Sequence, residues 1–113
     1  MGLAHLKPAE KVNLIALHGQ HGDLPQESSF ALTKTDRMEV IRLALSAGKQ
    51  IPEHRVDGEI TIQCLSGQLT FSVETEPSDL VAGDWMYLSA NQNHSLKAIT
   101  DCVVLVTIWL TKD

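Results

Sequence analysis

Gly48-Lys-Gln-Ile-Pro-Glu-His54-Arg-Val-Asp-Gly-Glu-Ile60-Thr-Ile-Gln-Cys-Leu-Ser-Gly67 and Gly83-Asp-Trp-Met-Tyr-Leu-Ser89-Ala-Asn91-Gln-Asn-His94 are the most informative segments of this chain. Each contains a histidine and combines turn-forming residues with short apolar runs. Turn signals recur along the chain at the spacing of short antiparallel strands. They fall at residues 19–22, 47–48, 57–58, 66–67, 82–84 and 91–93. This spacing predicts an all-β sandwich or barrel.

The apolar pattern between these turns also indicates strands. Leu69, Phe71 and Val73 alternate with polar residues, which is the period-two pattern of a strand with one face in water. Residues 103–110 form a continuous β-rich run suited to burial on both faces, in a barrel lining or at an interface. Only residues 8–11 resemble a helical turn, with Pro8 in its first turn. No alternation of strands and helices appears.

Length and composition limit the possible classes of protein. A chain of 113 residues, 43% hydrophobic and 20% charged, is expected to form one globular domain. Its formal charge of −5 offers no basic surface, so nucleic acid is not an expected partner. The chain has neither a signal-peptide pattern nor an apolar stretch long enough for a membrane span. We therefore expect a cytoplasmic protein without membrane contact, whose Cys64 and Cys102 are reduced thiols.

The two segments resemble the paired sequence signatures of cupins, and the chain is similar to small single-domain proteins of the RmlC-like cupin superfamily. The first cupin signature is Gly, five residues, His, one residue, His, three or four residues, Glu, six residues, Gly. Gly48, His54 and Gly67 occupy matching places. Val56 stands where the second histidine belongs, and Ile60 stands at the glutamate place.

The second signature is Gly, five residues, Pro, one residue, Gly, two residues, His, three residues, Asn. Gly83 and His94 match, whereas Ser89, Asn91 and Ala98 depart from it. The resemblance covers residues 48–98 and implies the cupin double-stranded β-helix, a jelly-roll barrel. It implies one barrel domain over residues 1–113, with an N-terminal arm or edge strand at 1–25 and the barrel core at 38–110.

The resemblance also implies a metal site, because cupins bind iron, manganese, nickel or zinc through three histidines and a glutamate. Only His54 and His94 of that set are present. A catalytic centre usually needs a third protein ligand, so these two residues form at best an incomplete site. Val56 and Ile60 cannot coordinate a metal, and they favour a drier pocket for an organic molecule.

The strand after Asp57-Gly58 has two possible registers. The register that the cupin resemblance implies, here called the family register, places Val56 opposite Ile60 across a three-residue loop. Ile60, Ile62 and Cys64 then face inward with His54. A two-residue Asp57-Gly58 turn would instead turn Glu59, Thr61 and Gln63 inward, and Glu59 or Gln63 would then be a possible third metal ligand. We prefer the family register because it buries two isoleucines.

Each of these residues also has a purely structural interpretation. His54 and His94 could be ordinary barrel histidines bonded to backbone or water, and Cys64 is expected to pack as a small hydrophobe. His18 and His21 are spaced like a metal pair, but the neighbouring Gly19, Gly22 and Asp23 predict an exposed loop there. Large aromatic side chains most often pack in cores or interfaces, so we expect that of Trp85, Tyr87 and Trp109.

Two functions remain. The first is a binding protein that holds a small, partly apolar molecule, with two histidines at its polar end. Its expected pocket comprises His54, Val56, Ile60, Ile62, Cys64, His94 and Leu96. The second is a metal-dependent cupin enzyme of the dioxygenase or isomerase type, with His54 and His94 as ligands and Glu59, Gln63 or water as the third. The resemblance implies a homodimer in either case, because short cupins commonly pair through sheet edges and terminal strands, and the run at residues 103–110 suits such an interface.

Overall fold

The structure is a computed structural model, which describes residues 5–14 and 29–110. Its regular structure is entirely β, as the sequence predicted. No helix in these two ranges is long and apolar enough to cross a membrane. The strands are β1 (Phe30–Lys34), β2 (Met38–Leu45), β3 (Gln50–His54), β4 (Gly58–Ser66), β5 (Gln68–Val73), β6 (Glu76–Val81), β7 (Trp85–Leu88), β8 (His94–Ala98) and β9 (Cys102–Leu110).

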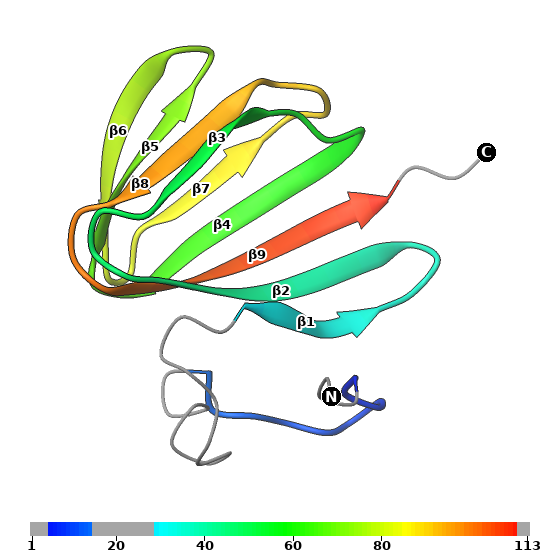
Figure 1. Cartoon of the computed structure of the whole chain (residues 1–113). Coiled ribbons are helices and arrows are strands. Elements are labelled where there is room, and N and C mark those ends of the chain that lie inside the picture. The colour runs from blue at the N-terminus through cyan, green and yellow to red at the C-terminus, as the bar shows by residue number, and fades with distance from the viewer. Residues whose placement is uncertain (1–4, 15–28, 111–113) are drawn as a thin grey trace.

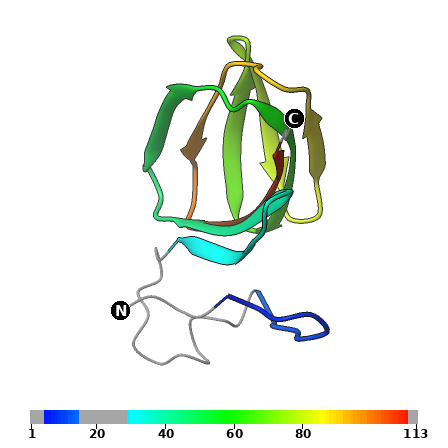
Figure 2. The same cartoon turned by 90° about the vertical axis from the view of Figure 1, so that its right-hand side faces the viewer.

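Two antiparallel sheets face each other (Figures 1 and 2). One has five strands in the order β1-β2-β9-β4-β7, and the other has four in the order β3-β8-β5-β6. The sheets converge at the end where β8 connects to β9 and diverge at the other end (Figure 1). Successive strands such as β2 and β3 belong to different sheets, so the chain winds around the core as a jelly roll.

β3 and β4 do not form the hairpin that both registers assumed. β3 pairs with β8, whereas β4 pairs with β9 and β7, because the residues between them cross from one sheet to the other. The inward face of β4 is nevertheless the one that the family register implies. Ile60, Ile62 and Cys64 are buried, and Glu59 is exposed.

The core lies between the sheets. Leu69 and Phe71 of β5 are buried, which agrees with the alternation in the sequence. β9 lies in the middle of its sheet and is hydrogen-bonded on one side to β2 and on the other to β4. Both edges of this strand are therefore occupied, so the run at residues 103–110 cannot extend a partner's sheet by edge pairing.

Trp85, Tyr87 and Trp109 do not pack in the core, so that half of the expectation is wrong, while packing at an interface stays a prediction. Their side chains are 61%, 51% and 46% exposed on the outer face of the five-stranded sheet. The inward positions of β7 are taken instead by Met86 and Leu88. Strand alternation overrides hydrophobicity here, because successive side chains point to opposite faces.

The described part of the N-terminal segment lies against the first two strands. The Leu6 amide donates to the Leu32 carbonyl at 2.7 Å, and Arg42 Nε of β2 donates to the Leu14 carbonyl at 3.1 Å. The helical turn expected at residues 8–11 is wrong. The Glu10 amide donates to the Lys7 carbonyl, and Ala9 has φ +72°, which is a β-turn conformation and not a helical one. His18 and His21 lie outside the described residues.

Candidate functional site

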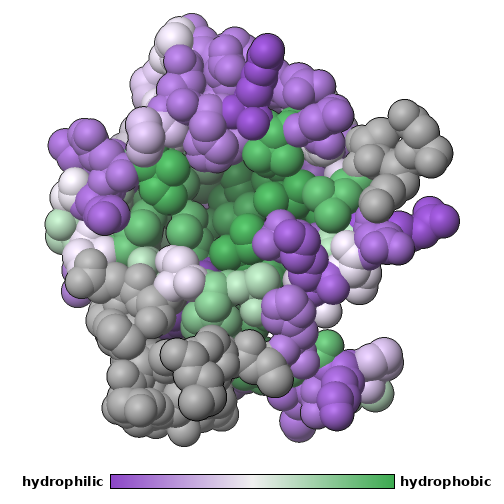
Figure 3. Space-filling model, turned by 45° about the vertical axis from the view of Figure 1, so that its right-hand side comes forward, coloured by the Kyte–Doolittle hydropathy of each residue, from purple (hydrophilic) through white to green (hydrophobic). Residues whose placement is uncertain are grey.

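A cavity of about 160 Å³ opens between the sheets at their divergent end. In the space-filling view its interior is apolar and its border is largely hydrophilic (Figure 3). His54 and His94 line it together with ten apolar side chains. These are Ile41, Leu43, Ile51, Val56, Ile60, Ile62, Phe71, Leu96, Val106 and Ile108.

The two histidines meet because β3 and β8 are neighbouring antiparallel strands in which His54 pairs with His94. Their ring centroids are 4.2 Å apart, with 62° between the planes. His94 also stacks on Phe71, with 5.6 Å between ring centroids and 11° between the planes. His94 is 6% exposed, whereas His54 is exposed, so the pair runs from the cavity wall toward solvent.

Backbone contacts set the tautomer of both rings. Nδ1 of His54 lies 3.0 Å from the Pro52 carbonyl oxygen, and Nδ1 of His94 lies 3.0 Å from that of Gln92. A carbonyl oxygen only accepts, so each Nδ1 carries the proton and donates it. Each neutral ring then presents an unprotonated Nε2 that can accept a hydrogen bond or bind a metal.

Burial favours the neutral form of His94. It lowers the pKa of this imidazole below its usual 6.5, against the opposing effect of the hydrogen bond to Gln92, and the nearby His54 lowers it further. An apolar cavity stabilises an uncharged ring better than an imidazolium. At neutral pH His94 is therefore a hydrogen-bond acceptor at Nε2.

Six of the seven pocket residues named from the sequence line this cavity. The exception is Cys64, which is fully buried and whose thiol donates to the Ser66 and Gly67 carbonyls at 3.5 and 3.6 Å. Its place in the closed part of the core agrees with the packing role expected of it. Sequence reasoning missed the other six lining residues, which are Ile41, Leu43, Ile51, Phe71, Val106 and Ile108. The alternate spacing of those on β2 and β9 was the signal that could have found four of them.

Glu59 and Gln63 cannot complete a metal site with the two histidines. They alternate along β4 with the buried Ile60, Ile62 and Cys64, so their side chains leave the opposite face of the sheet. The Glu59 carboxylate accepts a hydrogen bond from the Tyr87 hydroxyl on that outer face. This expectation is therefore wrong, because a strand reverses the direction of its side chains at each residue.

The donor set does not fit a three-ligand metal centre. Within residues 5–14 and 29–110, no group of three or more His, Cys, Asp and Glu side chains is placed to hold a metal ion. In both histidines Nδ1 contacts a backbone carbonyl oxygen, a partner that metal-binding histidines usually have. The two remaining ligand places of the cupin set are occupied by Val56 and Ile60, both of which line the cavity.

The departures in the second signature have local explanations. Asn91 stands at a glycine place and has φ +66°, a left-handed conformation that asparagine tolerates better than most residues. Its backbone amide donates to the Val56 carbonyl at 2.8 Å, which ties the loop before β8 to the segment between β3 and β4. At the proline place, the Ser89 amide donates to Gln92 Oε1 at 2.9 Å, a bond that proline could not make.

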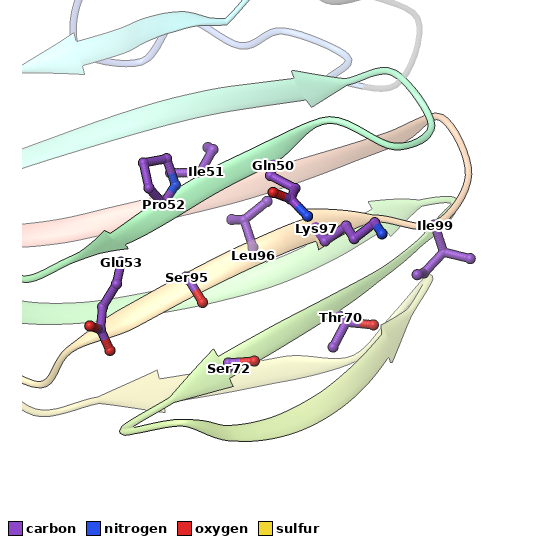
Figure 4. Close-up of a pocket in the computed structure, with 10 residues that line it drawn as sticks. All are labelled: Gln50, Ile51, Pro52, Glu53, Thr70, Ser72, Ser95, Leu96, Lys97 and Ile99. Atoms are coloured by element: carbon purple, nitrogen blue, oxygen red, sulfur yellow. The ribbon is translucent and has the colours of Figure 1, made fainter.

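A larger hollow of about 570 Å³ lies over the four-stranded sheet. Ser95 lies between Glu53 and Lys97, with Ser72 and Thr70 on the adjacent strand β5 (Figure 4). This hollow contains neither histidine. We take the smaller cavity as the candidate site because both signature histidines and both substituted ligand places line it.

Comparison with known proteins agrees with the two-sheet fold. The family profile described as Cupin domain matches residues 41–109. No curated protein sequence gave a significant match. Similar solved structures include a cupin superfamily protein from Desulfitobacterium hafniense, with a TM-score of 0.79 and 18% identity over 98% of this chain and 100% of that one. A conserved protein of unknown function from Streptococcus pyogenes has a TM-score of 0.77 and 17% identity over the whole of both chains.

A predicted oxalate decarboxylase from Thermotoga maritima is also similar, with a TM-score of 0.61 and 25% identity over 67% of this chain and 69% of that one. The profile match covers more than half of the chain, from β2 into β9. Together with the two-sheet topology, it shows that this chain belongs to the cupin family.

Proposed function

We propose that the barrel binds a small neutral molecule with an apolar body and one hydroxyl group. The observation that carries this proposal is the apolar cavity of about 160 Å³ that His54 and His94 line. Apolar cavities of roughly 150 Å³ hold a benzene ring, which sets the size of the apolar body. The two imidazoles would contact the polar end.

We infer a hydroxyl group on the ligand from the position of the proton on each histidine ring. Their Nδ1 atoms face the Pro52 and Gln92 carbonyls, so a ligand meets Nε2, an acceptor in the neutral ring. A hydroxyl group can donate to that atom, whereas a carboxylate would need an imidazolium. The lowered pKa of His94 in its buried place works against that charged form.

Calorimetric titration with phenol, toluene and benzoate at pH 7.5 tests this proposal. We expect phenol to bind more tightly than toluene by about fivefold, because one neutral hydrogen bond contributes about 1 kcal/mol. Benzoate should bind most weakly. The double variant His54→Leu, His94→Leu should bind phenol and toluene equally, while Val56→Phe, which reduces the cavity, should weaken both.

Equal binding of phenol and toluene by the unmodified protein would contradict the role of the histidines. Failure of all three probes to bind at millimolar concentration would contradict the cavity as a ligand site. Circular dichroism of the variants separates these results from a loss of folding.

A metal-dependent enzyme is the second candidate, and the orientation of the two imidazoles is the observation that favours it. In this alternative, water or substrate would supply the ligands that Val56 and Ile60 cannot. Elemental analysis of the tag-free protein and of His54→Ala and His94→Ala distinguishes the two. Near-stoichiometric iron, manganese, nickel or zinc that both substitutions abolish would support the enzyme and overturn the hydroxyl-binding role.

A further inference from the structure

Three of the five aromatic side chains of this protein lie exposed on one surface. Trp85 and Tyr87 of β7 and Trp109 of β9 are exposed. They share the face of Glu59 and Thr61, opposite to the buried Ile60 and Ile62, so they lie on the outer face of the five-stranded sheet. Each of these exposed aromatic side chains leaves apolar surface in contact with water, and burying that surface against a binding partner would be favourable. Such a patch marks an interaction site more often than a featureless surface does.

Two of these rings flank a hollow. Strand β4 lies between β9 and β7, with Glu59 opposite Trp109 and Thr61 opposite Tyr87. Directly opposed residues share one face of a sheet, so the Trp109 and Tyr87 side chains rise on either side of β4. Together with Glu59 and Thr61 they line a hollow of about 240 Å³.

The hollow contains a positioned carboxylate. The Tyr87 hydroxyl donates a hydrogen bond to Glu59 Oε2, which holds the carboxylate beside the aromatic rings. A carboxylate has two oxygen atoms and about four acceptor positions, so the other oxygen can still face a ligand. Rings and carboxylate together form an electron-rich surface on a chain whose formal charge is −5.

We propose that this hollow binds an organic cation, an alkylated ammonium group held against Trp109 and Tyr87 and neutralised by Glu59. The faces of tryptophan and tyrosine rings attract cations, and aromatic surroundings recognise quaternary ammonium groups. The negative charge of the protein favours the approach of a cation. The hollow lies on the opposite side of β4 from the barrel cavity, so this site is independent of the function proposed above.

A second copy of the chain is a less suitable occupant. A two-fold contact places the same patch on both subunits. Centred on this hollow, it would bring the two Glu59 carboxylates together, and like charges at an interface are unfavourable. An external cation neutralises the same carboxylate.

Tryptophan fluorescence tests the proposal directly, because Trp85 and Trp109 are the only two tryptophans in the chain. We propose titration with choline and with 3,3-dimethyl-1-butanol, its neutral analogue of the same shape. Choline should give a saturable change in fluorescence, and the neutral analogue should bind more weakly by at least about fivefold. Trp109→Leu and Glu59→Gln should each weaken choline binding, as measured by calorimetry.

Trp85→Leu is the matched control, because Trp85 is exposed on the same face but does not line the hollow. This variant should bind choline as the unmodified protein does. Equal binding of choline and its neutral analogue would overturn the proposal, and so would an equal loss in Trp85→Leu and Trp109→Leu. A dimer in sedimentation experiments that Trp109→Leu dissociates and choline does not affect would assign the face to a second copy instead.

Discussion

Replacing Gly67 by alanine, with Gly48→Ala as the control, tests the structural basis of the first cupin signature. Both glycines occupy fixed places of that signature, and both have positive φ, +80° and +87°. Their surroundings differ. A Cβ atom on Gly67 would lie 2.1 Å from the Asp101 carbonyl oxygen and 2.7 Å from Cys102 Cα, whereas a Cβ on Gly48 would have no atom within 4 Å.

The expected losses follow from these two environments. Left-handed backbone costs an L-residue about 1–2 kcal/mol, and the reduced entropy of the unfolded chain offsets about 0.4–1 kcal/mol of this. Gly48→Ala should therefore lower the free energy of unfolding by about 1 kcal/mol. Gly67→Ala adds overpacking against backbone, which costs about 1–3 kcal/mol more, so its total loss should be about 2–4 kcal/mol.

Urea denaturation followed by circular dichroism measures both losses. In thermal denaturation, Gly48→Ala should lower the Tm by about 4 °C and Gly67→Ala by about 8–16 °C. Equal losses in the two variants would refute the reasoning, because they would mean that the approach of Gly67 to Asp101 and Cys102 has no energetic consequence. A loss for Gly48→Ala alone would refute it as well.

Three further predictions concern the core and the histidine pair. Burial raises the pKa of the Cys64 thiol, and it raises the pKa of the Cys102 thiol to about 11. Both thiols should therefore resist iodoacetamide at pH 8 in the folded protein and react after unfolding in guanidinium. Rapid alkylation of both thiols in the folded state would contradict this. Since burial lowers the pKa of His94 in the folded state below the unfolded value of 6.5, the unfolded chain takes up the proton first as the pH falls. The free energy of unfolding should therefore decrease from about pH 6.5 down to the folded pKa, and His94→Leu should remove this component from urea titrations at several pH values. Ile62→Ala, at a side chain 1% exposed, should lower the free energy of unfolding by about 2–5 kcal/mol, while Thr61→Ala on the outer face should change it by about 0.5 kcal/mol or less.

Much of the fold could be predicted from local patterns. Leu69 and Phe71 alternate with polar residues and are buried on β5, because a strand sends successive side chains to opposite faces. Gly48, Gly67 and Gly83 lie at turns with positive φ. The signature spacing placed His54 and His94 at one site, and the pairing of β3 with β8 brings them together.

The pairing of β4 could not be predicted in the same way. The Asp57-Gly58 turn signal predicts a hairpin between β3 and β4, but these strands lie in different sheets. A turn signal reports where the chain changes direction. It does not report which strand lies alongside afterwards, because strand pairing depends on contacts between residues far apart in sequence.

The sequence by itself determined the all-β class, the turn positions and the loss of two metal ligands at Val56 and Ile60. These properties depend on the alternation of side chains and on residue identity, both of which are local. Only the tertiary structure decided that Glu59 is turned away from His54 and His94, and that Trp109 and Tyr87 flank it on the outer face. The physical reason is that these neighbours belong to different strands, β4, β7 and β9, whose order in the sheet arises from long-range pairing across the whole chain.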